Sequence, residues 1–403
     1  MWRSVAVGSA ALLTLVACTS GQAAAPQTRP GSPSVETRTL PADRGTRSAS
    51  TAPTSDRATS PRTATVLGSG DVLIHPPLWE QAHRDARAAG HSGYDFGPMY
   101  AGIAPDVRGA DLATCEMETP LAPPGGPFVG WPDFSAPPQV LTALKGVGYR
   151  TCTTASNHTL DQGYAGLKRT LDELDAAGLH HTGSARSAGE AGTPLLVTLR
   201  NGVKIGQLAY SFNFNGHEPS GSRTWEANLI DVATIRAAAA RTKRAGADIV
   251  VLSMHWGTEY DHLATQQQRD EAEQLLASPD IDLILGDHAH VVQPAQKIHG
   301  KWVFYCMGNQ ISRHADPIAD GREGIMPKVT FTEVSPHHFR TTAAAAVPTW
   351  MQDAPDLRLV DIPRALASGE LTAAQRGEAQ FAHAKIVKYL DAYGAVRAGL
   401  HIA

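Results

Sequence analysis

Two histidines lie at the end of a short apolar run in residues 282–290, which read Asp-Leu-Ile-Leu-Gly-Asp-His-Ala-His. The apolar run stops at Gly286, and His288 and His290 follow it. A buried parallel strand that delivers imidazoles at its carboxyl end is typical of a metal site. Because side chains two residues apart in a strand share a face, the spacing predicts that both histidines reach the same site.

The elements that must position these histidines read as an alternation of strands and helices. Apolar runs predict strands at residues 65–70, 110–118, 149–155, 247–254, 282–285 and 302–307. Periodicity and capping residues predict helices at residues 79–89, 137–146, 164–177, 231–245 and 265–277. Asn201 and Gly202 predict a tight turn between antiparallel strands at residues 193–200 and 203–210. The predicted fold class is therefore α/β with mixed sheets.

Six polar residues fall at or just after the carboxyl ends of these predicted strands: Asp71, Glu118, Asn157, His255, His288 and His290. Ligands bind at this edge of open α/β sheets, so residues far apart in sequence converge there. Carboxylates, imidazoles and one amide oxygen suit Zn, Mn or Fe, and six donors exceed the needs of one tetrahedral ion. We therefore expect two divalent ions bridged by one carboxylate, an arrangement suited to in-line displacement at phosphorus or to activation of a bridging water.

Some of these residues have a simpler interpretation when each is taken alone. Asp71 is also typical of a turn or a helix cap, and Asn157 of a turn. His255, beside Trp256, is also typical of a hydrogen-bonded core histidine. Their common position at strand ends favours the metal-site interpretation.

A set of motifs extends this pattern along the chain. They are Gly70-Asp71-Val72-Leu73, Glu118-Thr119-Pro120-Leu121, Ser156-Asn157-His158-Thr159-Leu160-Asp161-Gln162-Gly163, His255-Trp256-Gly257-Thr258-Glu259-Tyr260, Gly286-Asp287-His288-Ala289-His290-Val291-Val292-Gln293-Pro294 and Met307-Gly308-Asn309. Together they resemble the CapA family of poly-γ-glutamate capsule biosynthesis proteins, which are related to calcineurin-like metallophosphoesterases. The resemblance covers residues 65–313 and implies a four-layer α/β/β/α sandwich with a two-metal centre.

The resemblance also implies roles for individual residues. Asp71 and His290 would bind one metal, with His75 as a weaker candidate for the same ion. Glu118 would bridge, and Asn157, His255 and His288 would bind the second metal. His158 would act as general acid and transition-state stabiliser, oriented by Asp161. The residues expected to lie beside the ligands are Glu259, Gln293 and Asn309.

Two positions depart from the pattern of many relatives. Glu116 precedes the predicted bridge in Glu116-Met117-Glu118, where many relatives have Asn-Leu-Glu, and it could be a further ligand or face away. Asp287 stands where many relatives have histidine. Both departures bear on which metals and which substrate the centre accepts.

The amino terminus reads as targeting sequence. Arg3 precedes an apolar run at residues 5–17, which is too short to span a bilayer and predicts a signal peptide at residues 1–18. Residues 15–18, Leu-Val-Ala-Cys, resemble a bacterial lipobox, so Cys18 is either lipidated or incidental to an ordinary signal. Residues 19–62 are rich in Ser, Thr, Pro and Ala and predict a disordered tether. We expect a folded domain at residues 63–345 and a helical extension packed on it at residues 346–403.

The composition limits the classes of partner. The 403 residues are 42% hydrophobic and 18% charged, with a net charge of −4, which suits a large globular core and gives no support for nucleic acid binding. Besides Cys18 there are three cysteines, so a bridge between Cys115 and Cys152 that leaves Cys306 as a buried thiol is one possibility.

These features predict an exported protein, anchored by lipid at the outer face of the cytoplasmic membrane. The expected activity is metal-dependent hydrolysis of a capsule or envelope polymer such as poly-γ-glutamate, or of a phosphorylated precursor, alongside other capsule-synthesis components. The alternative is a non-catalytic envelope component that binds an anionic polymer through its metal centre.

Overall fold

The computed structural model describes residues 60–219, 221–313 and 321–403. The predicted signal peptide, lipobox and nearly all of the predicted tether lie outside these residues. Among the described residues, no helix combines the length and the apolar character needed to cross a membrane.

The first sheet has nine strands and is mixed. Its parallel part is formed by β1 (Thr63–Val72), β2 (Leu112–Glu116), β3 (Thr151–Thr153) and β4 (His180–Thr182). Its antiparallel part is formed by β12 (Glu323–Ser335), β13 (His338–Gln352) and β14 (Arg358–Asp361). The short strands β11 (Asn309–Ile311) and β15 (Leu400–Ile402) pair in parallel with β1 and β13.

The second sheet has six strands in the order β5 (Leu195–Thr198), β6 (Lys204–Ser211), β7 (Ile249–His255), β8 (Leu283–Asp287), β10 (Lys301–Phe304) and β9 (Ala295–Ile298). Strands β5 and β6 form the antiparallel hairpin predicted from Asn201 and Gly202. Gly202 has a φ of 82°, which a glycine adopts without steric cost. Strands β6, β7, β8 and β10 are parallel neighbours, so their carboxyl ends lie at one edge.

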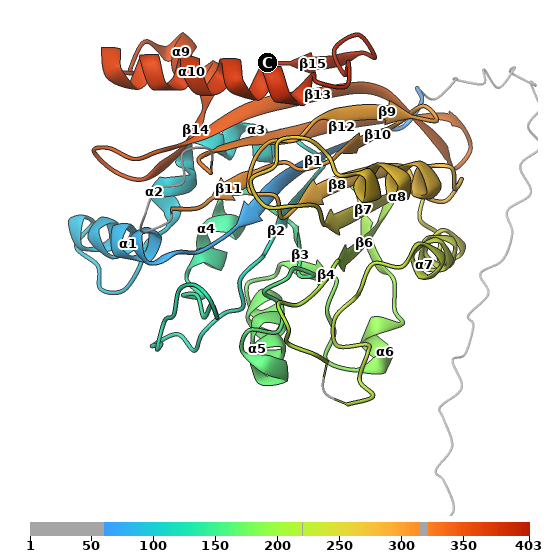
Figure 1. Ribbon diagram of the computed structural model, residues 1–403, viewed down its shortest axis with the longest axis horizontal. Coiled ribbons are helices and arrows are strands. Elements are labelled where there is room, and N and C mark those ends of the chain that lie inside the picture. The colour runs from blue at the N-terminus through green and yellow to red at the C-terminus, as the bar shows by residue number, and fades with distance from the viewer. Residues whose placement is uncertain (1–59, 220, 314–320) are drawn as a thin grey trace, which may run out of the picture. The chain divides into compact units, whose positions relative to one another are not determined.

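The core shows the expected four layers. One apolar cluster contains residues of both sheets, such as Val66 of β1 and Val251 of β7, and therefore lies between them. The next residues along these strands, Leu67 and Leu252, belong to separate clusters on the outer faces, as the two-residue period of a strand requires. Helices therefore cover each outer face, and the arrangement can be followed in Figure 1.

Two sets of helices form these outer layers. The helices on the first sheet include α1 (Pro76–Ala88), α4 (Val140–Val147) and α5 (Gly163–Ala176), and those on the second are α7 (Val232–Arg244) and α8 (Gln266–Leu276). The remaining helices are α2 (Gly97–Tyr100), η1 (Ala101–Ile103), α3 (Ala104–Arg108), α6 (Ala188–Ala191), α9 (Ile362–Ser368) and α10 (Ala373–Leu390). Helices α7 and α8 begin one residue later than predicted, because Asp231 and Thr265 are their N-caps.

The carboxyl-terminal segment differs from a purely helical extension. Residues 346–403 do contain α9 and α10, and α10 packs against β12 and β13 (Figure 1). The same segment also contains the end of β13, the whole of β14, and β15. Strand β13 runs without a break past residue 345, so this segment completes the first sheet as well as covering it.

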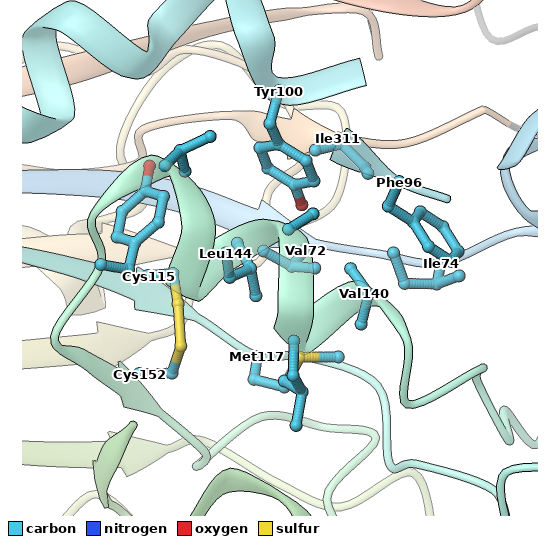
Figure 2. Packing of buried hydrophobic residues seen from close by; sticks show 14 of the residues in the cluster. Val72, Ile74, Phe96, Tyr100, Cys115, Met117, Val140, Leu144, Cys152 and Ile311 are labelled. Atoms are coloured by element: carbon cyan, nitrogen blue, oxygen red, sulfur yellow. A yellow bond between two sulfur atoms is a disulfide. The ribbon is translucent and has the colours of Figure 1, made fainter. Parts of the chain in front are cut away.

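A disulfide joins Cys115 of β2 to Cys152 of β3, and Cys306 is a buried free thiol. The two bridged residues are register partners on adjacent parallel strands. Figure 2 shows the bridge within the apolar cluster that includes Tyr100 and Leu144. The structure thus has the pairing that the sequence left open.

Candidate metal centre

The proposed ligands come from strand ends of both sheets. In the first sheet, Asp71 of β1 pairs in register with Glu116 of β2. In the second sheet, His255 of β7 pairs in register with Asp287 of β8. The two edges meet because an Asp71 carboxylate oxygen accepts a hydrogen bond of 3.2 Å from the backbone N–H of His288. A single site is therefore built across the two sheets.

His288 and His290 reach this site through a turn and not through a strand. Strand β8 ends at Asp287, and the next two histidines have φ values of 91° and 57°. The prediction that strand periodicity places both rings on one face is therefore wrong, because neither residue is extended. Left-handed backbone at non-glycine residues costs about 1–3 kcal/mol each and is concentrated at functional sites.

The first group of donors contains Asp71, Glu118 and His290, whose ligand atoms lie within 4.8 Å of one another. His290 Nδ1 is 3.0 Å from Asp71 Oδ2, and His290 Nε2 is 3.8 Å from Glu118 Oε1. His290 Nδ1 also lies 3.1 Å from Asn309 Oδ1. This placement of Asn309 agrees with its expected position beside the ligands.

The second group surrounds His255. Its Nε2 is 3.0 Å from Asn157 Oδ1 and 3.9 Å from Glu118 Oε1. Its Nδ1 is 3.7 Å from Glu116 Oε1. The His288 ring lies 4.8 Å from that of His255, centroid to centroid. Glu118 thus stands between the two groups, where a bridging carboxylate would have to be.

Several buried donor atoms in this centre have no hydrogen-bond partner among the described residues. They are both carboxylate oxygens of Glu116 and of Glu118, His255 Nδ1, His288 Nδ1 and Asp287 Oδ1. Buried polar atoms are almost always hydrogen-bonded, since leaving one unpaired costs about 1–3 kcal/mol. Carboxylates and imidazoles left in this way fit divalent cations, so the residues present are compatible with a metal site.

Crowding and burial also shift the acid–base properties of the centre. Burial, together with the nearby Glu118, raises the pKa of Glu116 well above its ordinary value, and burial with Asp71 does the same to the pKa of Asp287. Burial lowers the pKa of His288 to about 3. Burial also acts to lower the pKa of His290, but the Glu118 and Asp71 carboxylates outweigh it and raise that pKa to about 10. The metal-free cluster therefore disfavours negative charge on its carboxyls, and a bound cation would stabilise their charged forms.

His158 and Asp161 form a separate pair next to these groups. His158 Nδ1 is 2.7 Å from Asp161 Oδ2, which also accepts a 2.8 Å hydrogen bond from the backbone N–H of Phe134. The rings of Phe134 and His158 pack in a T-shaped arrangement, with centroids 4.7 Å apart. The pair is buried, and the imidazole is held from two sides.

A cavity of about 270 Å³ opens onto the centre. Its lining residues are Leu73, His75, Trp131, Phe134, His158, Glu259, Tyr260 and His290. None of these lining residues, within the described part of the chain, is a lysine or arginine. Trp131 is 76% exposed and offers an aromatic face at the rim. A ligand in this cavity would reach both His158 and His290.

Two predicted residues lie outside the groups of clustered donors. The Gln293 side chain hydrogen-bonds to Gln268 and to the backbone carbonyl of Asp261, so it supports a neighbouring loop. His75 lines the cavity, with Nδ1 3.2 Å from the Leu73 carbonyl oxygen. Glu259, in contrast, offers a donor atom that groups with His288 and His290.

Sequence reasoning did not assign several residues that the structure brings to the site. Trp131, Phe134 and Tyr260 line the cavity, and Asn215 lies with Nδ2 3.4 Å from His158 Nδ1. Asp287 joins the buried carboxylates although no role could be given to it from sequence. The register partner of Asp287 is His255, so a correct sheet register could have identified it.

Comparison with known proteins places this chain in a family. Residues 65–314 match the family described as bacterial capsule synthesis protein PGA_cap. The chain belongs to this family. The resemblance inferred from the motifs over residues 65–313 is thereby confirmed.

The capsule-protein relatives are distant. The chain is 30% identical over 169 residues to "PGA biosynthesis protein CapA" of Bacillus subtilis, covering 42% of this chain and 44% of that protein. It is 25% identical over 272 residues to "Capsule biosynthesis protein CapA" of Bacillus anthracis, covering 65% and 62%. The matched region spans less than two thirds of either relative.

Solved structures of phosphoesterases are similar at low identity. The calcineurin-like phosphoesterase YfkN from Bacillus subtilis has a TM-score of 0.44 at 13% identity, over 82% of this chain and 99% of that chain. A phosphatase from Mycoplasma pneumoniae has a TM-score of 0.43 at 11% identity, over 73% and 96%.

Proposed function

We propose that this PGA_cap protein is an exported, lipid-anchored, metal-dependent hydrolase. It would act on a capsule or envelope polymer of the poly-γ-glutamate type, or on a phosphorylated precursor. The observation that carries the proposal is the position of Glu118. Its buried carboxylate accepts no hydrogen bond from the described residues and lies between His255 and His290, beside the cavity that contains His158.

The residues divide into two sets of ligands. Asp71 and His290 would hold one cation, Asn157, His255 and His288 would hold a second, and Glu118 would bridge them. Divalent cations such as Mn, Fe or Zn, when bound, lower the pKa of a ligated water and offset negative charge in the transition state. Glu116 lies 3.7 Å from His255 and would keep that ring oriented, or add a further oxygen ligand.

His158 would supply the proton that the leaving group needs. A carboxylate only accepts hydrogen bonds, so the His158 atom facing Asp161, Nδ1, carries a proton in this pair. That contact fixes the ring, so when His158 is doubly protonated its Nε2–H is the group that would donate a proton to a leaving oxygen. Proton transfer from a positioned histidine is worth about 10²–10⁴-fold in rate.

The assignment to the cell envelope rests on three features. The names of two relatives refer to PGA and capsule biosynthesis. The Cys115–Cys152 disulfide suits a protein that folds in an oxidising compartment. Cys18 of the lipobox-like segment would then carry the lipid that holds the protein at the outer face of the cytoplasmic membrane.

Metal analysis of the purified protein, followed by a panel of aryl phosphomonoesters, phosphodiesters and poly-γ-glutamate, tests the proposal. We expect bound transition metal and turnover of at least one substrate. His158→Ala should retain the metal and lose turnover about 10²–10⁴-fold. The control His299→Ala changes an exposed histidine that pairs with Glu273 at 2.8 Å, and should have no effect.

Two outcomes would overturn parts of this proposal. A protein without stoichiometric metal would remove its chemical basis. Metal-loaded protein that retains poly-γ-glutamate but turns over no substrate would instead identify a non-catalytic component that binds an anionic polymer through its metal centre.

A further inference from the structure

A second cluster of metal-ligating side chains lies next to His158 and apart from the proposed ligands. It contains Asp133, Asp161 and His217, which come from three separate segments of the chain. One donor atom from each lies within 4.8 Å of the other two. His217 Nε2 is 3.1 Å from Asp133 Oδ1, so two of the donors are already in contact.

Asp161 contributes a buried oxygen, Oδ1, to this cluster. Its Oδ2 accepts hydrogen bonds from His158 and from the Phe134 backbone N–H. Its Oδ1 has no hydrogen-bond partner among the described residues, although the side chain is fully buried. The neighbouring Asp133 adds negative charge: burial first and Asp133 in addition raise the pKa of Asp161. An uncompensated buried oxygen beside another carboxylate indicates a missing positive charge.

We propose that Asp133, Asp161 and His217 bind a divalent cation, at a site distinct from the two-metal centre. Two carboxylates and one imidazole form a donor set that Zn²⁺ accepts, with further positions open to water. Ligands about 2.0–2.1 Å from a tetrahedral zinc lie roughly 3.3 Å apart. The 3.1 Å between His217 and Asp133 is close to that separation.

This inference goes beyond the proposed function, because the cation bound by Asp133, Asp161 and His217 would hold two segments of the chain together. The cation joins the segment that carries Asp133 and Phe134, which lines the cavity, to the loop that carries His217. It also fixes one oxygen of Asp161 while the other oxygen holds His158. Asp161 is thus a positioning residue that links an outer cation to the proposed general acid.

Zinc binding to the full chain tests the site directly. Equilibrium dialysis at about 10 µM free zinc should give one more equivalent in the wild type than in Asp133→Asn or His217→Ala. Both substituted side chains are partly exposed, at 55% and 37%, so both variants are expected to fold. The matched control His299→Ala removes an exposed histidine paired with a single carboxylate and should keep the wild-type stoichiometry.

A second arm separates this site from the two-metal centre. His255→Ala should lower zinc binding at that centre, and adding His217→Ala to it should remove one further equivalent. Wild-type stoichiometry in both Asp133→Asn and His217→Ala would overturn the proposal and leave only a surface ion pair. This outcome would not affect the two-metal centre, whose ligands are unchanged in these variants.

Discussion

Two regions of this molecule differ in how their buried carboxylates are paired with positive charge. In the carboxyl-terminal part of the first sheet, Glu323 of β12 pairs with Lys385 of α10 at 2.8 Å, and both side chains are largely buried. In the candidate metal centre, Glu116, Glu118 and Asp287 crowd together, and their buried oxygens include several that accept no hydrogen bond from the described residues. The first region pairs one carboxylate with one lysine. In the second region His290 offsets Asp71 and Glu118, while the pKa values of Glu116 and Asp287 stay raised by burial and by neighbouring carboxylates.

The difference distinguishes buried charges that stabilise the fold from buried charges that are available to bind a cation. A buried pair holds two elements together, and removing one partner leaves an uncompensated charge. A buried cluster of like charges lowers stability until something positive binds, and such clusters are concentrated at functional sites. The two regions should therefore respond to substitution in opposite ways.

The largest expected effect comes from Glu118→Gln. The change preserves shape and removes the carboxylate between His255 and His290, so metal content should fall and turnover should drop by about 10³-fold. Removing a repelling charge should at the same time leave the metal-free protein no less stable. Elemental analysis, kinetics and denaturant unfolding give the three readouts, with surface Glu273→Gln as control. Strong destabilisation of the metal-free variant would contradict the comparison.

Lys385→Met should act in the opposite sense. It removes the Lys385 ammonium from the buried Glu323 carboxylate, so the free energy of unfolding should fall by about 3 kcal/mol while metal content stays the same. Lys388→Met, on the exposed side of the same helix, is the control. Adding Glu323→Gln should restore most of the loss. If the double substitution is no more stable than the single one, the pair is not what stabilises this region.

The metal-free protein should lose stability as pH rises from about 7 to about 9. The pKa of His290 is raised to about 10, so the folded state keeps a proton that the unfolded state releases near pH 6.5. The raised pKa values of Glu116 and Asp287 act in the same direction, because the folded state also favours their protonated forms. Each such proton contributes up to about 1.4 kcal/mol per pH unit. Denaturant midpoints should be measured across this pH range with chelator and with added metal. We expect the midpoint to fall with rising pH only in the samples with chelator.

The smallest effect is expected from Trp131→Ala. The exposed indole at the cavity rim should contact substrate without touching the metal ligands, so KM should rise roughly fivefold, about 1 kcal/mol, with little change in kcat. Phe381→Ala removes a comparably exposed aromatic ring, 69% accessible, from α10 and serves as control. A fall in kcat with unchanged KM would place Trp131 in the chemistry and not at the rim.

Local pattern predicted much of the scaffold. The hairpin at Asn201 and Gly202, the helices predicted at residues 231–245 and 265–277, and the strand predicted at residues 282–285 all follow from short-range preferences. Strands β12 and β13 were not predicted. Strand β13 includes a run of four alanines and Pro348, which are weak strand formers, and it is held in place by long-range pairing with β12.

The sequence by itself determined which donor types stand at the strand ends, because parallel strands bring their carboxyl ends to a common edge. Only the tertiary structure decided which of those donors meet. Glu118 lies between His255 and His290, Asp287 joins the carboxylates, and Asp133 meets His217. These contacts depend on how the two sheets and their loops pack, and on the left-handed backbone at His288 and His290. The local sequence does not specify how close residues of different strands and loops come to one another.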